Sequence, residues 1–271
     1  MVLALAATFG GQPGVQAWAA DHRVSLEARV GTKTEPLKTG VIWRVYRAVN
    51  GKSGEVLVGV AEAQGGPARF DLPSGSYYLH ASYGRAVRTE RLIVEGDTHR
   101  AVVLGAGALM LDATAGGQAI APDLLRFDIY EHRRRDDGKR RIVAFNVRPS
   151  EVTRLNAGTY HVLSRYGRLR TEVRADLVVR SGETTRAVMQ HRGAEVRLKL
   201  ASAPGGIPIA NTAWSIFSEQ GEKLYESARN APRIVLPEGG YEAVARNGET
   251  TLKRSFAVRP GTPVDLELLL P

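Results

Sequence analysis

The 271-residue chain is long enough for one large domain or for two or three small ones, and length alone does not choose between them. Its 37 lysines and arginines exceed its 28 acidic residues, and the resulting formal net charge of +9 makes an anionic partner or surface a reasonable hypothesis. The absence of cysteine excludes thiol catalysis and cysteine-ligated zinc.

The first twenty residues have the pattern of an export signal. An apolar run over residues 2–9 is followed by a Gly/Pro break and by Ala-Trp-Ala at residues 17–19, which signal peptidase could cut before Ala20. No lysine or arginine precedes the run, so either the first methionine is a misplaced start or the segment is not a signal. No later stretch approaches the roughly 20 apolar residues of a membrane-spanning helix. We expect residues 1–20 to be a signal peptide and the protein to be periplasmic or secreted.

One motif recurs three times in the rest of the chain. It reads LPSGSYYLHASYG from Leu72, LNAGTYHVLSRYG from Leu155 and LPEGGYEAVARNG from Leu236. The first tyrosines of the three motifs are separated by 83 and 81 residues, and a glycine follows each of them seven residues later. A fixed period of this kind marks duplicated structural units. We therefore predict three repeats, over residues 24–104, 105–190 and 191–271.

Within each repeat the apolar residues alternate as they do in strands. Val41, Trp43 and Val45 fall on one face of a strand, and residues 125, 127 and 129 repeat this pattern in the second copy. An Asn-Gly, Asp-Gly or Gln-Gly pair follows in each copy and predicts a hairpin. About 80 residues cut by turns every 8 to 12 residues make roughly seven short strands. The sequence predicts an all-β protein of three tandem immunoglobulin-like or prealbumin-like sandwiches, with little helix.

The recurrent motif itself has a structural explanation. Proline and glycine set a tight turn, the leucine enters the core, and the tyrosine begins the next strand with its hydroxyl free to bond backbone. This arrangement resembles the tyrosine corner of Greek-key sandwiches. We expect Tyr77, Tyr160 and Tyr241 to be structural corners and not binding residues.

The first copy, from ARFDLPSG at Ala68 to AVVL at Leu104, resembles the carboxypeptidase-regulatory-like and PEGA-type sandwich modules of bacterial envelope proteins. The second and third copies are similar to exported proteins of alphaproteobacteria. The resemblance implies accessory or adhesion units without catalytic activity, and it transfers no functional residue.

Sequence motifs for chemistry are missing. Gly51-Lys52-Ser53 ends like a phosphate-binding loop, but Tyr46 stands where the loop needs a glycine and a strand follows in place of a helix. None of the six histidines lies three to five residues from another, and no nucleophile has a plausible base. We therefore predict a protein that is not an enzyme and has no cofactor and no metal.

The second predicted hairpin is strongly basic. Its EHRRRDDGKRR tip carries Arg133, Arg134, Arg135, Lys139, Arg140 and Arg141, whereas the equivalent tips read AVNGKSG and SEQGEKL. Such a cluster suits a polyanion: an acidic polysaccharide, lipid head groups or nucleic acid. Only Tyr130 and His132 flank it, which counts against a lectin-like or base-stacking surface and makes nucleic acid the weakest of these candidates. The alternative is a solubilising tip that Asp136 and Asp137 partly neutralise.

Three functions remain open. The first is an exported, non-catalytic, envelope-associated scaffold or binding protein, whose partner is another envelope protein or an anionic envelope polymer. The second is a polyanion binder that uses the basic tip. The third is an accessory module of a separately encoded envelope enzyme.

Overall fold

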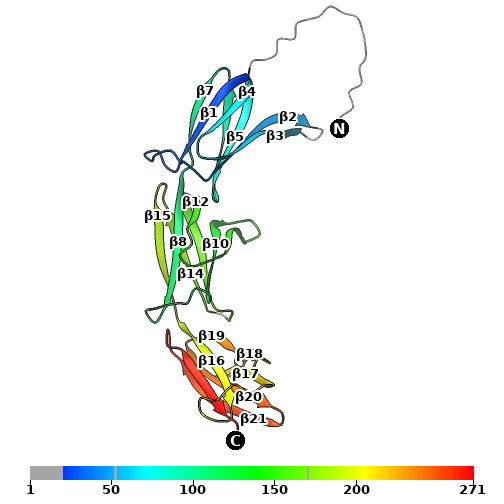
Figure 1. Cartoon of the computed structure of the whole chain (residues 1–271), viewed down its shortest axis with the longest axis vertical. Helices are drawn as coiled ribbons and strands as arrows, with labels where there is room; N and C mark the ends of the chain where they lie inside the picture. The colour runs from blue at the N-terminus through cyan, green and yellow to red at the C-terminus, as the bar shows by residue number, and fades with distance from the viewer. Residues whose placement is uncertain (1–20, 52–53, 170) are drawn as a thin grey trace, which may run out of the picture. The chain divides into compact units, whose positions relative to one another are not determined.

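The computed structural model describes residues 21–51, 54–169 and 171–271, so the signal-like segment and the Lys52-Ser53 part of the first hairpin tip lie outside the described residues. Every regular element in the described ranges is a strand. Within them there is no helix of the length and apolarity that crossing a membrane requires. The prediction of an all-β protein is confirmed (Figure 1).

The first sandwich packs a three-stranded sheet, β4-β1-β7, against a four-stranded sheet, β3-β2-β5-β6. Its strands are β1 (Asp21–Arg29), β2 (Val41–Gly51), β3 (Gly54–Gly65), β4 (Ala68–Pro73), β5 (Gly75–Tyr83), β6 (Ala86–Val94) and β7 (Thr98–Val103).

The second sandwich repeats this arrangement with the sheets β12-β8-β15 and β11-β10-β13-β14, and the two-residue β9 pairs with β8. Its strands are β8 (Ala106–Ala115), β9 (Gln118–Ala119), β10 (Leu125–Arg134), β11 (Arg140–Val147), β12 (Thr153–Asn156), β13 (Gly158–Tyr166), β14 (Glu172–Val179) and β15 (Thr184–His191).

The third sandwich has the sheets β19-β16-β22 and β18-β17-β20-β21. Its strands are β16 (Gly193–Ala201), β17 (Thr212–Ser218), β18 (Lys223–Ser227), β19 (Arg233–Pro237), β20 (Gly239–Asn247), β21 (Thr250–Val258) and β22 (Val264–Leu269). In the second and third sandwiches the first and last strands lie side by side and parallel, as β8 with β15 and β16 with β22. The predicted series of three tandem sandwiches is confirmed.

The bulky residue of each central strand is buried where the alternation places it. Trp43, Phe127 and Trp214 are fully buried between the two sheets of their sandwiches. Each indole N–H still finds an acceptor: Trp43 Nε1 donates to the carbonyl of Gly66 at 2.8 Å, and Trp214 Nε1 donates to that of Asn230 at 3.3 Å. The tryptophans therefore bury a large apolar surface without losing a hydrogen bond.

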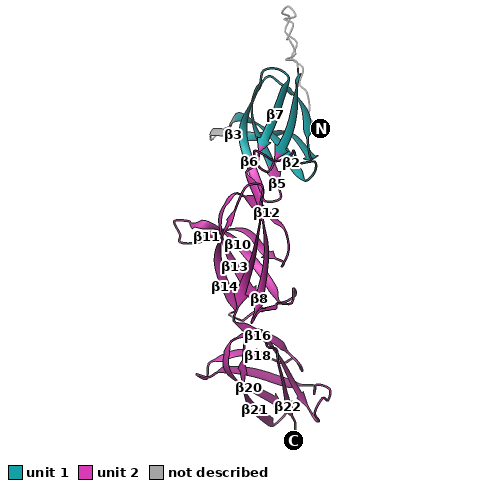
Figure 2. Cartoon of the chain, turned by 90° about the vertical axis from the view of Figure 1, so that its left-hand side faces the viewer, with its two compact units in different colours: residues 1–28, 36–81, 89–102 teal, residues 29–35, 82–88, 103–271 magenta. Residues whose placement is uncertain are grey.

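By compactness the chain divides into two units (Figure 2). One extends up to Ala28 and includes Pro36–Ala81 and Thr89–Val102. The other comprises Arg29–Glu35, Ser82–Arg88 and Val103–Pro271, so it contains the second and third sandwiches together with two loops of the first. The repeat boundaries assigned from the sequence therefore stay a prediction.

Candidate functional site

The three motif tyrosines make the same contact. The hydroxyl of Tyr77 donates to the carbonyl of Pro73 at 2.8 Å, that of Tyr160 to Asn156 at 2.9 Å and that of Tyr241 to Pro237 at 2.9 Å. Burial raises the pKa of Tyr160 and of Tyr241, which keeps both hydroxyls protonated as donors. In every copy the ring and the hydroxyl are used to close a turn onto the preceding strand.

The basic tip lies on the hairpin of β10 and β11, and half of its cations are occupied by the hairpin itself. Arg134 Nη1 donates to the carbonyl of Gly138 at 2.7 Å, and Arg140 Nε donates to that of His132 at 3.1 Å. Arg141 pairs with Glu131, and this hydrogen bond holds the pKa of the Glu131 carboxyl below its ordinary value. These contacts stiffen the hairpin.

The other three cations of the tip, Arg133, Arg135 and Lys139, make no side-chain hydrogen bond or ion pair with any described residue. Asp137 uses a carboxylate oxygen to accept the backbone N–H of Lys139 at 3.0 Å, which shapes the turn. The tip thus presents three cations to solvent from a hairpin that the remaining three hold in shape.

Two histidines of the second sandwich share one carboxylate beside this hairpin. His161 Nδ1 lies 2.7 Å from one oxygen of Asp176, and His132 Nδ1 lies 3.4 Å from the other. The hydrogen bond to His161 holds the pKa of Asp176 below its ordinary value. Residues that are far apart in sequence meet here because β13 pairs with both β10 and β14.

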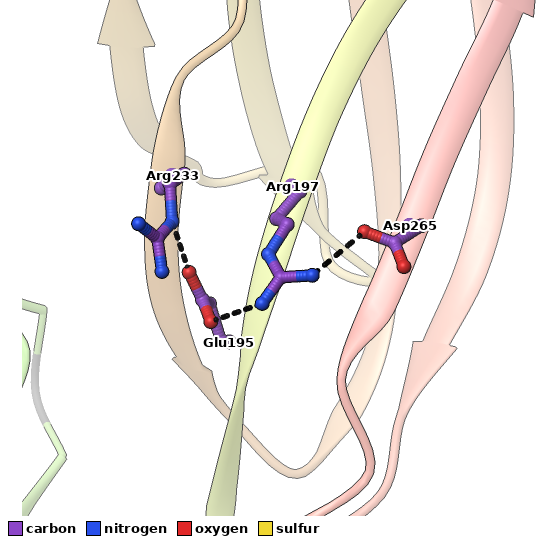
Figure 3. Close-up of polar contacts among 4 residues, drawn as sticks. All are labelled: Glu195, Arg197, Arg233 and Asp265. Atoms are coloured by element: carbon purple, nitrogen blue, oxygen red, sulfur yellow. Dashed lines mark hydrogen bonds and ion pairs between the residues drawn. The ribbon is translucent and has the colours of Figure 1, made fainter. Parts of the chain in front are cut away.

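A second charged cluster lies on the three-stranded sheet of the third sandwich (Figure 3). Glu195 on β16 is buried and accepts hydrogen bonds from Arg233 Nε of β19 and from Arg197 Nη2, the latter at 3.0 Å. Burial by itself raises the pKa of Glu195, but the hydrogen bonds from Arg233 and Arg197 outweigh it and hold the pKa below its ordinary value. Arg197 also approaches Asp265 on β22 at 3.5 Å. The carboxylate therefore fixes both guanidinium groups.

The second and third sandwiches interlock beside this cluster. Val235 on β19 belongs to the hydrophobic core of the second sandwich, while Leu169 packs against the core of the third. Gly167 has the positive φ of 71° and lies so close to Val235 that an added Cβ would come within 2.5 Å of the valine Cβ. Each sandwich thus completes the core of its neighbour.

Another buried carboxylate orders the end of the second sandwich. Asp128 on β10 accepts Arg165 Nη2 at 2.9 Å and the backbone N–H of Asn146 at 2.9 Å. Asn146 has a φ of 59°, at a bulge between β10 and β11. The Arg165 guanidinium lies 5.3 Å from the centre of the Phe145 ring, which is 63% exposed. Sequence reasoning missed Asp128, Arg165 and Glu195, because their partners come from strands whose register no short motif specifies.

The fold defines a tandem-repeat β-sandwich protein. A family model described as the Rhizobiales growth-associated tandem repeat domain matches residues 195–270, which cover most of the third sandwich. It is a different family from the carboxypeptidase-regulatory-like and PEGA-type modules that the motifs resemble. No curated protein sequence matches the chain.

Among solved structures, the chain is similar to the Bacillus anthracis TIE protein, with 16% identity, 92% of this chain and 51% of that chain covered, and a TM-score of 0.26. It therefore spans about half the length of that protein. The minor pilin of Streptococcus agalactiae shows 14% identity over 63% of this chain and 95% of its own, with a TM-score of 0.34. The major pilin subunit of Bacillus cereus shows 10% identity over 92% and 99%, with a TM-score of 0.24. TM-scores this low do not indicate a shared function.

Proposed function

We propose that the protein is an exported, non-catalytic scaffold or binding protein of the cell envelope. Its sandwich repeats would present binding surfaces at a fixed spacing. The observation that supports this most is the interlock of Val235 and Leu169. An interface whose side chains belong to each other's cores resists the rotation that a flexible linker would allow. The signal-like segment supports the exported location.

Cell fractionation tests the location. The full-length chain, with a carboxyl-terminal tag, is expressed in an alphaproteobacterial host, and N-terminal sequencing of the recovered protein locates any cleavage. We expect recovery from the periplasm or the medium with a mature end near Ala20. Recovery of uncleaved protein from the cytoplasm alone would overturn the envelope assignment. Tagged protein that copurifies with a hydrolase would favour the accessory-module form of the proposal.

Polyanion binding by the basic tip is the second candidate function, and the three unoccupied cations Arg133, Arg135 and Lys139 support it. Replacing these three residues by serine removes three positive charges without touching the contacts that shape the hairpin. We expect the variant to leave a heparin column at lower salt than the parent, because each lost contact reduces counterion release. An unchanged elution salt would dispose of this function.

A further inference from the structure

A cationic cleft lies where the second and third sandwiches interlock. Five arginines line it, three from the second sandwich and two from the third: Arg126, Arg165, Arg168, Arg229 and Arg233. The acidic residues of the lining are Asp123 and Glu195. The excess of guanidinium groups makes this cleft a place where an anion would gain energy on entering.

Two of the five arginines are available for a ligand. Arg233 is bound to Glu195 and Arg165 to Asp128, while Arg126 Nη1 donates to the carbonyls of Pro122 and Leu125 at 2.7 and 2.6 Å. The side chains of Arg168 and Arg229 are exposed and make no hydrogen bond or ion pair with the part of the chain that the structure describes. They come from different sandwiches and line the same cleft, so one ligand can contact both.

The bound arginines make the cleft wall rigid. Glu195 and Asp128 are 7% and 3% exposed, and each binds one lining guanidinium. The side chains of Arg233 and Arg165 nevertheless stay 58% and 31% exposed, so a ligand can still reach them. The wall of the cleft is therefore organised before any ligand arrives, which reduces the entropic cost of binding.

An aromatic side chain lines the cleft together with the free cations. Tyr225 belongs to the same lining as Arg168 and Arg229. Its ring offers an apolar face to a ligand that also carries charge. A sugar ring bearing a carboxylate has both features, since its C–H face packs on the aromatic ring while the carboxylate takes a bidentate guanidinium contact.

We propose that this cleft binds a carboxylate-bearing polysaccharide, with Arg168 and Arg229 as the anion contacts and Tyr225 as the contact to a sugar face. The inference deepens the proposed binding role. It uses none of the six cations of the basic tip, so either surface can fail without the other. A nucleic acid fits less well, because a regular phosphate backbone calls for a continuous track of cations.

The test is a titration of the full chain with oligogalacturonate, followed by calorimetry, and the methyl-esterified oligomer is the neutral control. We expect saturable binding of the acid form alone. The variant Arg168→Gln/Arg229→Gln should lose affinity about tenfold or more. Arg133→Gln/Arg135→Gln removes the same two charges from the tip and should change the affinity less than twofold. Tyr225→Leu, which keeps an apolar side chain against the core of the third sandwich, should weaken binding of the oligosaccharide and leave binding of inorganic sulfate unchanged.

Four outcomes would overturn the proposal. They are the absence of saturable binding, equal binding of the esterified oligomer, equal losses in the two double variants, and tighter binding of a single-stranded oligonucleotide than of oligogalacturonate. All four substituted arginines are exposed, so each double variant should have the melting temperature of the parent. If only the tip variant loses affinity, polyanion binding by the tip stands and the cleft is refuted.

Discussion

Gly84 and Gly167 occupy the same position in two copies of the motif, yet they meet different neighbours within the second unit. A Cβ on Gly84 would lie 3.0 Å from the Cβ of Arg154, whose guanidinium lies 4.6 Å from the centre of the Tyr83 ring. At Gly167 the neighbour is the buried Val235. The third copy has Gly248 with a φ of 57° and nothing within 4 Å. The turn alone therefore calls for glycine three times, and close packing adds a second requirement at two positions.

The two contacts also differ in chemistry. Around Gly84 the loop is held by polar bonds: Arg85 N donates to Arg154 O at 3.1 Å, and the side chain of Asn156 bonds both backbone groups of Val87. Around Gly167 the contact is apolar and shared with a hydrophobic core. The same position of the motif therefore makes a polar contact in one copy and an apolar contact in another. The difference comes from the neighbouring strand, which supplies Arg154 from β12 in the first case and Val235 from β19 in the second.

The largest effect is expected from Gly167→Ala. The new methyl group meets Val235 at a distance that atoms do not adopt, and alanine is strained at this positive φ. We expect a loss of about 3 to 5 kcal/mol in the free energy of unfolding. Gly248→Ala carries only the strain and should cost about 1 kcal/mol. In denaturant titrations, equal losses at the two positions would refute the close contact, and Val235→Ala in the Gly167→Ala background should recover part of the loss.

The second-largest effect is expected from acid, which should lower the free energy of unfolding through a buried histidine packed on the residue before Gly167. His191, which is buried against Tyr166 and hydrogen-bonded to Ser164 at 2.8 Å, has its pKa lowered by burial to about 4. The unfolded chain takes up this proton near pH 6.5, so the free energy of unfolding falls as the pH drops from 6.5 towards 4. We expect His191 to account for about 2 to 3 kcal/mol of that fall. Stability measured against pH for the parent and for His191→Gln isolates this part, and parallel curves would contradict it.

Gly84→Ala should cost about 2 kcal/mol, less than the same change at Gly167. The strain of the positive φ is the same, but the contact with the Arg154 Cβ is longer, at 3.0 Å against 2.5 Å for the Val235 Cβ at Gly167. Denaturant titration of both alanine variants under one set of conditions ranks them. A loss at Gly84 as large as that at Gly167 would show that the polar contact is as tightly packed as the apolar one.

The smallest effect is expected from Asn156→Ala. Asn156 stands where the first and third motifs have proline, and its side chain makes hydrogen bonds of 2.9 to 3.1 Å with the backbone of Val87 and Leu104. Their loss should cost about 1 to 2 kcal/mol, because the backbone groups regain water. Pro237→Ala at the same place in the third copy is the control, and it should not alter protection of the Val87 amide from hydrogen exchange. Unchanged Val87 protection in Asn156→Ala would contradict the bond.

The sequence predicted the strands and their series well, because the information is local and repeated. The alternation around Trp43 and Trp214 is enough to place both indoles in a core, and the spacing of Tyr77, Tyr160 and Tyr241 marks the copies. The site was harder to predict. Arg134 and Arg133 look alike in sequence, and only the course of the hairpin decides that one is held by Gly138. In the sequence Asn156 only replaces the proline of the other two motifs, and its bonds to Val87 depend on a loop far along the chain.

The parallel pairing of β8 with β15 has a mechanical consequence. Because the first and last strands of the second sandwich run side by side in one direction, the chain enters at one end of that pair and leaves at the other. Tension applied to the chain before β8 and after β15 would pull the two strands lengthwise past each other. Their hydrogen bonds would then have to break simultaneously and not one after another. The pairing of β16 with β22 gives the third sandwich the same resistance to stretching.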